Sequence, residues 1–366
     1  MKIIETELRT IELPLVRPFR TSFGTQTYRE VLLVSILNEN GTRGWAECVA
    51  MSSPLYSPEF TDGCRDVIKK FYLPKLRQKN GITAEEVEMT LRPFLGGHMA
   101  KAAIETAILD AQLRDLGISL ATYLGATKGR VECGVSVGIA ESMDALVDEV
   151  TSYVEIGYRR IKLKIEPGWD IEPVSRIRSL FPAIPLQVDA NQAYSRQDGK
   201  HLANLDEYNL LMIEQPLDEH DILGHAALAL EVKTPICLDE SIISLRSAED
   251  ALAMKATTVI NIKPGRVGGY RESVKIHDLC LSKKIPVWCG GMLETGIGRA
   301  ANLALAALPG FTLPGDTSAS SRYFQRDITE PFVMDDGYLK VPTNAGIGID
   351  PDMDYLESIT VACEKL

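Results

Sequence analysis

The feature that most constrains the fold is a regular alternation of short apolar runs with helical segments after residue 131. Residues 143–156 and 248–255 have helical periodicity, and strand-like runs flank them. Short buried strands that alternate with helices predict parallel βαβ units. Seven or eight such units favour a β/α barrel, whose strands we place at residues 131–139, 160–165, 185–189, 210–214, 235–239, 259–263, 286–289 and 311–314.

An open, doubly wound sheet is the alternative for this pattern. Such a sheet normally carries a Gly-x-Gly-x-x-Gly turn after its first strand, where a dinucleotide phosphate binds. The nearest approach to this motif is Gly265-Arg266-Val267-Gly268-Gly269, which follows a late strand and has the wrong spacing. The sequence therefore favours the closed barrel.

The residues before the barrel have a mixed α+β pattern. Residues 1–50 predict antiparallel strands with a turn at 38–41, and residues 59–116 predict helices. Residues 18–25 have no periodicity, so we predict a polar and aromatic loop there. We treat residues 1–125 as a separate segment beside the barrel.

Composition argues against nucleic acid or a membrane as a partner. The net charge is −11 and the pI is about 5.1, so no basic surface for phosphates or anionic lipids is expected. Acidic residues interrupt the N-terminus where a signal peptide needs an apolar run, and the apolar segment 300–308 is too short to cross a bilayer. The seven cysteines form no Cys-x-x-Cys pair. We expect a cytoplasmic protein with reduced thiols.

Polar residues recur at the ends of the predicted strands with nearly constant spacing. Intervals of 25, 25, 25, 24 and 25 residues separate Lys164, Asp189, Glu214, Asp239, Lys263 and Trp288. One βα repeat advances the chain by one strand, so this spacing predicts a ring of side chains at one height. The ring lies at the C-terminal strand ends, where barrel active sites are built.

Three acids of this ring, Asp189, Glu214 and Asp239, point to a metal site. Carboxylates that meet in a barrel mouth repel one another unless a cation neutralises them. A hard divalent cation does so and keeps positions open for water and substrate, so we predict Mg²⁺, with Mn²⁺ as the alternative. Each acid would otherwise only cap the helix after its strand. Capping does not explain why lysines share the spacing.

The lysines of the ring have the character of proton-transfer groups. Lys162 and Lys164 lie on the same strand face because side chains alternate, and like charges this close favour a neutral amine. A solvated edge strand is the alternative, but the flanking Ile161 and Ile165 indicate burial. Lys263 is four strands from Lys164, on the opposite wall of an eight-stranded ring.

Two opposed lysines beside a metal suit the chemistry of a carboxylate substrate. Loss of the proton next to the carboxylate produces an enediolate, whose extra charge a metal neutralises. A racemase needs one base to remove the proton and a second to return it from the other face. The same pair suits an elimination, with one lysine as base and the other as a stabilising cation.

At these positions the sequence resembles the enolase superfamily, muconate-lactonising branch, and within it the o-succinylbenzoate synthase / N-acylamino acid racemase family. That superfamily is a known case of a lysine base that works with Mg²⁺. The resemblance covers nearly the whole chain and rests on residues 18–25, Lys162-Leu163-Lys164-Ile165, Asp189-Ala190-Asn191, Glu214-Gln215-Pro216, Leu238-Asp239-Glu240-Ser241, residues 262–269 and residues 290–298.

The resemblance implies a modified TIM-type (β/α)7β barrel at residues 126–321, with an α+β capping domain of residues 1–125 completed by residues 322–366. It makes Asp189, Glu214 and Asp239 the metal ligands. Lys164 becomes the base, Lys162 the neighbour that lowers its pKa, and Lys263 the opposite acid/base.

The resemblance also implies which residues contact the substrate, although ordinary core packing is the alternative for the aromatic and Met side chains among them. These residues are Phe19, Phe23, Met51, Tyr56, Ser136, Asn191, Gly291, Met292 and Leu293. Glu240 and Arg266 are expected behind the catalytic groups. For Arg266 the alternative is an exposed loop arginine.

The implied activity is dehydration by o-succinylbenzoate synthase in menaquinone synthesis, with N-acylamino acid racemisation as a main or side activity. Related dipeptide epimerases bind a free ammonium group with an Asp-x-Asp pair, whereas this chain has Gly291-Met292-Leu293. This segment suits an uncharged acyl or succinyl arm. Muconate cycloisomerase and other enzymes of the branch remain alternatives. A non-enzymatic scaffold would need a lost ligand or lysine, and none is lost. The family further implies a homo-oligomer.

Overall fold

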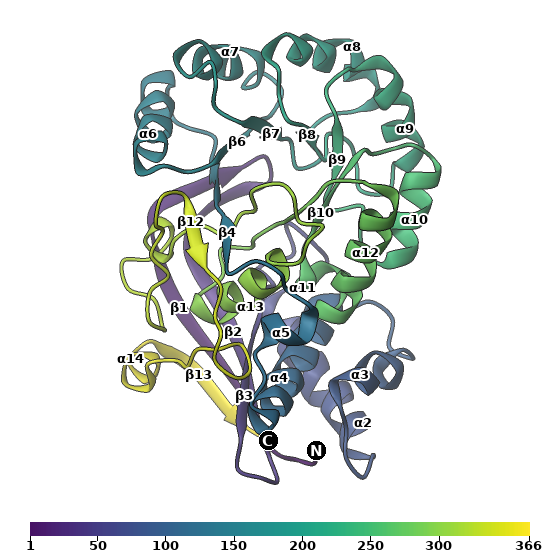
Figure 1. Cartoon of the computed structure of the whole chain (residues 1–366), viewed down its shortest axis with the longest axis vertical. Coiled ribbons are helices and arrows are strands. Elements are labelled where there is room, and N and C mark those ends of the chain that lie inside the picture. The colour runs from purple at the N-terminus through teal and green to yellow at the C-terminus, as the bar shows by residue number, and fades with distance from the viewer.

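The computed structural model describes all 366 residues and contains two main sheets (Figure 1). The first is antiparallel, with the strand order β13-β1-β2-β3. Its members are β1 (Ile3–Thr21), β2 (Gly24–Asn38), β3 (Arg43–Cys48) and β13 (Thr360–Lys365). Because β13 pairs with β1, the two ends of the chain meet in one sheet.

Helices cover one face of this antiparallel sheet. The central one is α4 (His98–Leu116), which lies within the region 59–116 predicted to be helical. It packs so closely on β3 that a Cβ at Gly44 would lie 2.2 Å from the carbonyl oxygen of Ala107. The surrounding helices are α1 (Thr61–Val67), the π-helical turn Ile68–Tyr72, α2 (Leu73–Arg77), α3 (Ala84–Leu91) and α5 (Leu120–Leu124).

The second sheet consists of seven parallel strands in chain order, curled and wrapped by helices. The strands are β5 (Gly134–Val137), β6 (Arg160–Lys164), β7 (Leu186–Asp189), β8 (Ile213–Glu214), β9 (Ile236–Leu238), β10 (Val259–Ile262) and β11 (Val287–Cys289). The helices are α6 (Met143–Ile156), α7 (Ile171–Leu180), α8 (Gly199–Leu202), α9 (Ile222–Glu231), α10 (Leu245–Ala253), α11 (Pro264–Val267), α12 (Tyr270–Lys283) and α13 (Gly296–Ala306). The predicted β/α barrel class is confirmed.

Two predicted strands differ from the structure. The run 131–139 divides into β4 (Arg130–Glu132), which pairs with β12 (Tyr338–Lys340), and β5, because the chain passes from one sheet to another at Cys133. The run 311–314 makes only isolated bridges, Val287↔Phe311 on one side and Cys133↔Gly315 on the other. Pro314 has no N–H group to extend a ladder there. This segment joins the two edges of the curled sheet.

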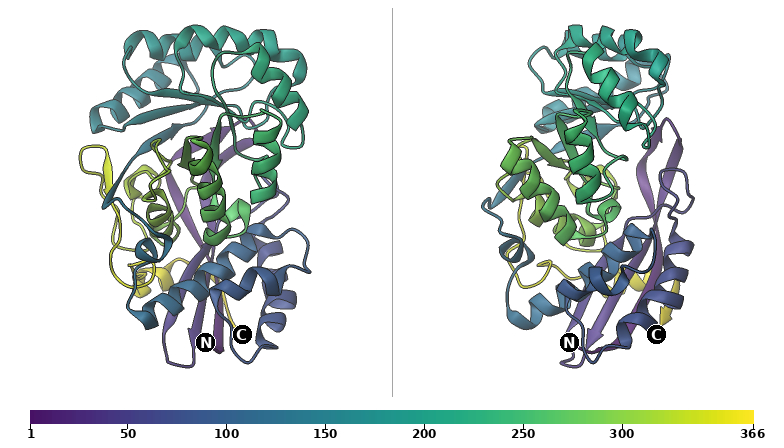
Figure 2. Two further views of the ribbon diagram at one scale, coloured as in Figure 1. Left: turned by 45° about the vertical axis from the view of Figure 1, so that its right-hand side comes forward. Right: turned by 90° about the vertical axis from the view of Figure 1, so that its right-hand side faces the viewer.

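The stretch 18–25, predicted as a loop, is the tip of the β1–β2 hairpin. The register of β1 against β2 shifts between Pro14 and Phe19, where prolines interrupt the ladder, and pairing then resumes to Thr21↔Gly24. That interruption hid the strand pattern. The hairpin reaches from the antiparallel sheet to the curled one (Figure 2).

Three contacts fix the hairpin tip over the carboxyl ends of the barrel strands. The amide of Ile139 donates to the carbonyl of Arg20 at 2.9 Å. The hydroxyl of Ser22 donates to the carbonyl of Asn191 at 3.2 Å, and Arg20 forms an ion pair with Glu166 at 2.8 Å. The antiparallel domain therefore covers the end of the barrel where the predicted ring lies.

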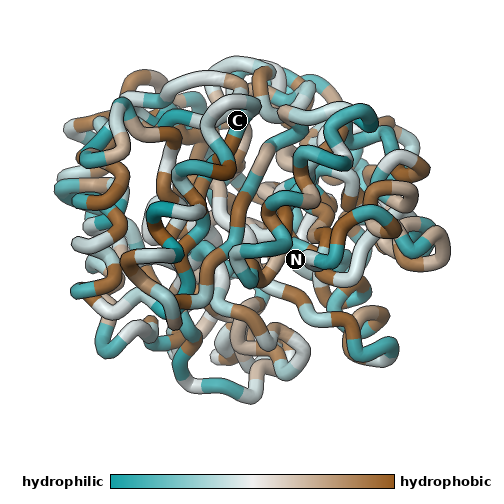
Figure 3. The backbone as a smooth tube through the Cα atoms, turned by 90° about the horizontal axis from the view of Figure 1, so that it is seen from above, coloured by the Kyte–Doolittle hydropathy of each residue, from teal (hydrophilic) through white to brown (hydrophobic).

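Hydropathy follows this layered plan. In Figure 3 hydrophobic and hydrophilic stretches alternate along the outer helices, as expected when one helix face packs on a sheet and the other meets solvent. One large cluster of buried side chains runs through both sheets. No helix is both long and apolar enough to cross a membrane. The C-terminal α14 (Met353–Ser358) leads into β13.

The close approach of β3 and α4 predicts a large cost for one added methyl group. We expect Gly44→Ala to reduce the free energy of unfolding by about 1–3 kcal/mol, because the backbone atoms of α4 cannot move aside separately. Denaturant titration followed by circular dichroism measures this. Gly129→Ala is the matched control, since no atom lies within 4 Å of the position that a methyl group would take there, and its backbone is not left-handed. Equal stability of the two variants would contradict the packing argument.

Candidate active site

The predicted ring forms at the carboxyl ends of β6 to β8. Lys164 is in register with Asp189, and Asp189 is in register with Glu214. One layer below, Lys162 is in register with Gln187. All of these side chains are buried. The 25-residue spacing therefore places one lysine and two acids side by side on successive strands.

Beyond β8, the 25-residue spacing no longer places the predicted residues in register on neighbouring strands. Glu214 is in register with Cys237, so Asp239 lies two residues further along its strand. This stagger is what a tilted barrel strand requires. The expectation for Trp288 is wrong: it pairs with Asn261, below Lys263, and Gly290 occupies the ring level because its amide donates to Ile262. A constant spacing of 25 residues predicts the wrong level for a side chain wherever neighbouring strands are staggered.

Lys164 is held between an acid and an amide. Its ammonium group is 2.6 Å from Oδ2 of Asp189 and donates a hydrogen bond to Oδ1 of Asn191. Asn191 adopts a left-handed backbone conformation, with φ of 42°. Its side-chain amide donates to Glu240 at 2.9 Å. Asn191 and Glu240 thus fix the position of the predicted base.

Lys162 is the most heavily neutralised cation of the site. Its ammonium group lies 3.1 Å from Asp189, 3.2 Å from Glu214 and 2.7 Å from Asp316. Burial lowers the pKa of Lys162, but these carboxylates outweigh it and hold that pKa well above its ordinary value. The role predicted for Lys162 is that of a charged neighbour of the base. It remains a fixed positive charge two residues from Lys164.

Lys263 lies in a second cluster of charges around Asp239. Its ammonium group is 2.9 Å from Asp239 and donates to the hydroxyl of Tyr56 at 3.0 Å, and that hydroxyl donates to Asp239 at 3.1 Å. Arg266 also donates to both Asp239 and Tyr56. Burial raises the pKa of Asp239, but Arg266 and Lys263 outweigh it and hold the pKa well below its usual range. Arg266 is buried, so the exposed-loop alternative is wrong.

Glu214 has neutral as well as charged partners. Asn261 donates to Oε1 at 2.8 Å, and Gln187 donates to Oε2 at 3.2 Å. Burial raises the pKa of Glu214 to about 8, and the charge of Asp189 adds to the rise. Glu214 is therefore held by two neutral amides and by Lys162, with Asp189 as a negative neighbour.

The donor set fits a hard divalent cation. Asp189, Glu214 and Asp239 are buried carboxylates at neighbouring strand ends, and oxygen ligands of this kind suit a hard divalent cation. The three acids do not converge as a ready cluster of ligands, because ammonium groups of the lysines lie against them. A cation held by these acids would replace the lysines as their counter-charge.

The predicted substrate contacts divide into groups. Tyr56 and Asn191 belong to the charged network itself. Phe23 packs on Tyr56 with ring centroids 5.9 Å apart, and Phe19 lies under the guanidinium of Arg322 at 5.8 Å. These aromatic side chains belong to the capping domain, and both lie near its contact with the barrel.

On the barrel side, Ser136 is in register with Lys162, and its buried hydroxyl has no hydrogen-bond partner. Met292 borders the same small cavity as Lys263, and Leu293 has a left-handed backbone with φ of 57°. A Cβ at Gly291 would lie 2.9 Å from the carbonyl oxygen of Asp316. Met51 makes a single parallel bridge with Phe60 in the capping domain, outside the charged network.

The sequence reasoning missed four polar residues of the site, which are Arg160, Gln187, Asn261 and Asp316. Gln187 and Asn261 each precede a ring residue by two positions, so strand alternation predicts them one layer lower. Arg160 holds Asp316 at 2.8 Å across the seam of the barrel. That contact has no sequence signal, because Asp316 lies beyond the predicted strand 311–314 and outside the 25-residue spacing.

Comparison with known proteins identifies the class. Residues 3–125 match the N-terminal domain of the mandelate racemase / muconate lactonizing enzyme family, and residues 145–355 match the family described as enolase C-terminal domain-like. The chain belongs to the enolase superfamily, in the branch that contains mandelate racemase and muconate lactonizing enzyme. Members of this superfamily are generally dependent on a divalent metal.

Within the branch, the chain is similar to enzymes of two names. It is 54% identical to an N-succinylamino acid racemase of an Amycolatopsis species, over 99% of this chain and 98% of the relative. It is 46% identical to an o-succinylbenzoate synthase of Geobacillus kaustophilus, over 96% of this chain and 94% of the relative. A solved enolase-superfamily structure from Listeria innocua superposes with a TM-score of 0.96 at 42% identity, covering 100% and 99% of the two chains.

Removing one acid of the ring should weaken metal binding. We expect Glu214→Gln to reduce Mn²⁺ affinity by about 100-fold or more, since a charged ligand becomes a neutral amide of the same shape. Titration followed by the electron paramagnetic resonance signal of free Mn²⁺ measures this. Asp170→Asn is the control, because Asp170 is also a buried loop acid, held by Tyr194 and His201 at 2.7 Å each. The metal assignment fails if both variants bind like the wild type.

Proposed function

We propose that this chain is a metal-dependent enzyme with o-succinylbenzoate synthase and N-succinylamino acid racemase activity at one site. The observation that carries the proposal is the placement of two buried lysines on different walls of the barrel. Lys164 ends β6 and Lys263 follows β10, four strands away, and each contacts a different acid of the ring. Relatives of both names, similar over nearly their whole lengths, support this assignment.

Asp189, Glu214 and Asp239 would hold Mg²⁺, with Mn²⁺ as the alternative. When bound, the cation supplies stabilisation for negative charge that develops on the substrate carboxylate. The neighbouring groups of the chain then keep the acids in place: Asn261 and Gln187 hold Glu214 through hydrogen bonds to its two oxygens. These partners fix a carboxylate without adding charge.

Lys164 is the proposed base that removes the proton next to the substrate carboxylate. Lys162 lies on the same strand face two residues away, and its ammonium group is held by Asp189, Glu214 and Asp316. Racemisation then requires Lys263 to return a proton from the opposite face. In a syn-dehydration the proton and the hydroxyl group leave from one face, so Lys164 serves both steps and Lys263 stays an ammonium group.

The substrate arm is proposed to be acyl and without an ammonium group. Met292 and Leu293 offer apolar surface, and no Asp-x-Asp pair is present at this position. An L-Ala-D/L-Glu epimerase of Bacillus subtilis is 28% identical to this chain, against 54% for the N-succinylamino acid racemase and 46% for the o-succinylbenzoate synthase. The unpartnered hydroxyl of Ser136 is suited to donate a hydrogen bond to an acyl carbonyl.

Racemisation as the main role is the second candidate, and the 54% identity to an N-succinylamino acid racemase favours it. The ratio of kcat/KM for dehydration to kcat/KM for racemisation shows which of the two activities is the main one. Muconate cycloisomerase has less support, because muconate lactonizing structures such as that of Pseudomonas fluorescens are 24% identical and share the fold alone. Every ligand and lysine is present, which argues against a scaffold.

The proposal extends to partners and location. The partner is a small carboxylate substrate rather than nucleic acid or a membrane. All seven cysteines are free thiols, which is the state expected of a cytoplasmic enzyme. We also propose a homo-oligomer on the family's pattern.

Two lysines on opposite faces of the substrate predict that replacing each one slows proton exchange for a different enantiomer. In deuterated buffer with Mg²⁺, Lys164→Ala should slow exchange of the α-proton of one N-succinylamino acid enantiomer by about 10³-fold, and Lys263→Ala should do the same for the other enantiomer. Proton NMR measures each rate. Lys128→Ala is the control, because Lys128 only donates to the carbonyl of Phe311. Equal loss for both enantiomers in each variant would contradict the two-base arrangement, and absence of exchange in the wild type would contradict the enzyme assignment.

A further inference from the structure

A glutamate of the capping domain reaches into the barrel beside the proposed acyl pocket. Glu47 lies on β3, and its Oε2 accepts hydrogen bonds from the amide of Thr295 at 2.9 Å and from its hydroxyl at 2.7 Å. Thr295 is the residue before α13 and does not cap that helix with its own side chain. The carboxylate of Glu47 therefore supplies a helix cap from another domain.

The segment 290–295, which Glu47 holds at one end, carries the proposed acyl contacts. Leu293 has the left-handed backbone noted above, which a non-glycine residue adopts only when its surroundings hold it. Glu294 accepts from the amide of Met292 and from the side chain of Asn302, both at 2.9 Å. Two carboxylates, one from each domain, thus fix the conformation of Met292 and Leu293.

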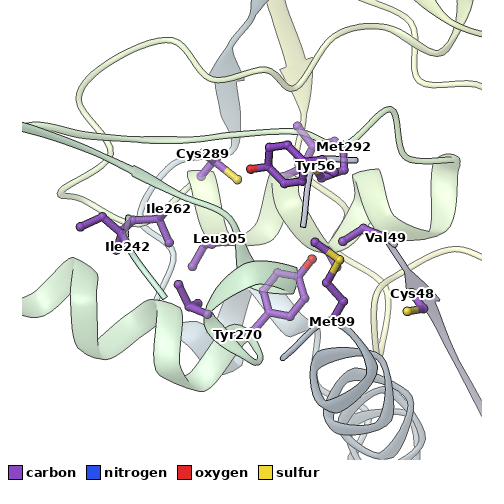
Figure 4. Packing of buried hydrophobic residues seen from close by; sticks show 14 of the residues in the cluster. Cys48, Val49, Tyr56, Met99, Ile242, Ile262, Tyr270, Cys289, Met292 and Leu305 are labelled. Carbon is purple, nitrogen blue, oxygen red and sulfur yellow. The ribbon is translucent and has the colours of Figure 1, made fainter. Parts of the chain in front are cut away.

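A small, partly open cavity lies between the carboxyl groups of Glu47 and Glu294 and the side chain of Lys263. Its volume is about 30 Å³, which is room for a single water molecule. Residues that line it include Glu47, Val49, Lys263, Tyr270, Met292 and Glu294, and Figure 4 shows Val49, Tyr270 and Met292. Oε1 of Glu47 is buried and has no hydrogen-bond partner. An internal water in this cavity would satisfy it.

Gly298 makes room for both acids. A Cβ at this position would lie 3.0 Å from Oε2 of Glu47 and 2.8 Å from Cγ of Glu294. Burial raises the pKa of Glu47 to about 8; the charge of Arg29 opposes the rise and that of Glu294 adds to it. A protonated Glu47 allows the two acids to lie close together at neutral pH.

We propose that Glu47 is a positioning residue that, through Thr295, holds Met292 and Leu293 in the conformation that receives the acyl arm of the substrate. The proposal rests on the proposed function for its choice of substrate. On this proposal, the acyl pocket keeps its conformation only while the capping domain is docked on the barrel. Glu47 itself does not touch substrate.

The test compares three variants with a matched control. Glu47→Ala removes the hydrogen bonds to Thr295, Glu47→Gln keeps an acceptor oxygen, and Thr295→Val removes only the hydroxyl donor. Glu105→Ala is the control, because Glu105 is likewise a buried capping-domain acid, with a pKa raised to about 7 by burial, and it accepts from the amide of Arg271 at the start of α12.

Hydrogen–deuterium exchange of residues 290–295 gives a readout that needs no substrate. We expect faster exchange there in Glu47→Ala, a smaller change in Thr295→Val, and wild-type exchange in Glu47→Gln. Glu105→Ala should speed exchange only near residue 271. Unchanged exchange of residues 290–295 in Glu47→Ala, or an equal change in Glu105→Ala, overturns the proposal.

Steady-state kinetics tests the consequence for substrate. For racemisation of an N-succinylamino acid, Glu47→Ala should raise KM about tenfold with kcat within about threefold, and Glu47→Gln should restore KM. An equal loss of thermal stability in Glu47→Ala and Glu105→Ala with unchanged KM overturns the proposal. If the wild type does not racemise any N-succinylamino acid, the proposed function fails, and the exchange data still decide whether Glu47 positions the segment.

The pH profile separates positioning from simple structural support. The titratable groups that face Glu47 are Arg29 on β2, Glu294 and Tyr270, with Lys263 on the far side of the cavity. Above pH 8 Glu47 ionises and repels Glu294, so KM of the wild type should rise there more steeply than KM of Glu47→Gln. Parallel profiles of the two proteins overturn the coupling between Glu47 and the acyl pocket.

Discussion

The structure depends on charge compensation between buried acids and buried cations at the mouth of the barrel. An isolated carboxylate in such a place is strongly unfavourable, and Asp189, Glu214 and Asp239 are each paired with lysine or arginine. Asp189 lies between Lys162 and Lys164, and Asp239 lies between Lys263 and Arg266. The proposed function needs the same groups in another arrangement, with a dication on the acids and at least one lysine free to take a proton. Under this proposal the ion pairs keep the site stable until metal and substrate replace them.

The second constraint is that the barrel does not complete this site alone. Tyr56 of the capping domain contacts both Lys263 and Asp239, and the β1–β2 hairpin lies over the strand ends. Glu47 connects the antiparallel sheet to the start of α13. Because the C-terminal β13 pairs with β1, the last part of the chain also stabilises the domain that carries these contacts. The proposed catalytic groups come from the barrel, while the capping domain encloses them.

Sequence reasoning succeeded where local periodicity decides the structure. Lys164, Asp189 and Glu214 meet in register because the βα repeat length is constant, and this placed the metal and base candidates together. It failed where strand stagger or chain closure intervenes: Trp288 lies one layer too low, and Asp316 comes from the seam of the barrel. The hairpin tip at 18–25 was hidden because prolines break the strand pattern that alternation relies on.

The central claim is that Asp189, Glu214 and Asp239 share one divalent cation that displaces the lysines from them. The most direct measurement is anomalous X-ray scattering from a crystal grown with Mn²⁺ and an N-succinylamino acid. We predict one strong peak at about 2.0–2.3 Å from oxygens of all three acids, with the ammonium groups of Lys164 and Lys263 turned to opposite faces of the substrate. A peak elsewhere, or lysines that remain paired with Asp189 and Asp239 beside bound substrate, would contradict the account.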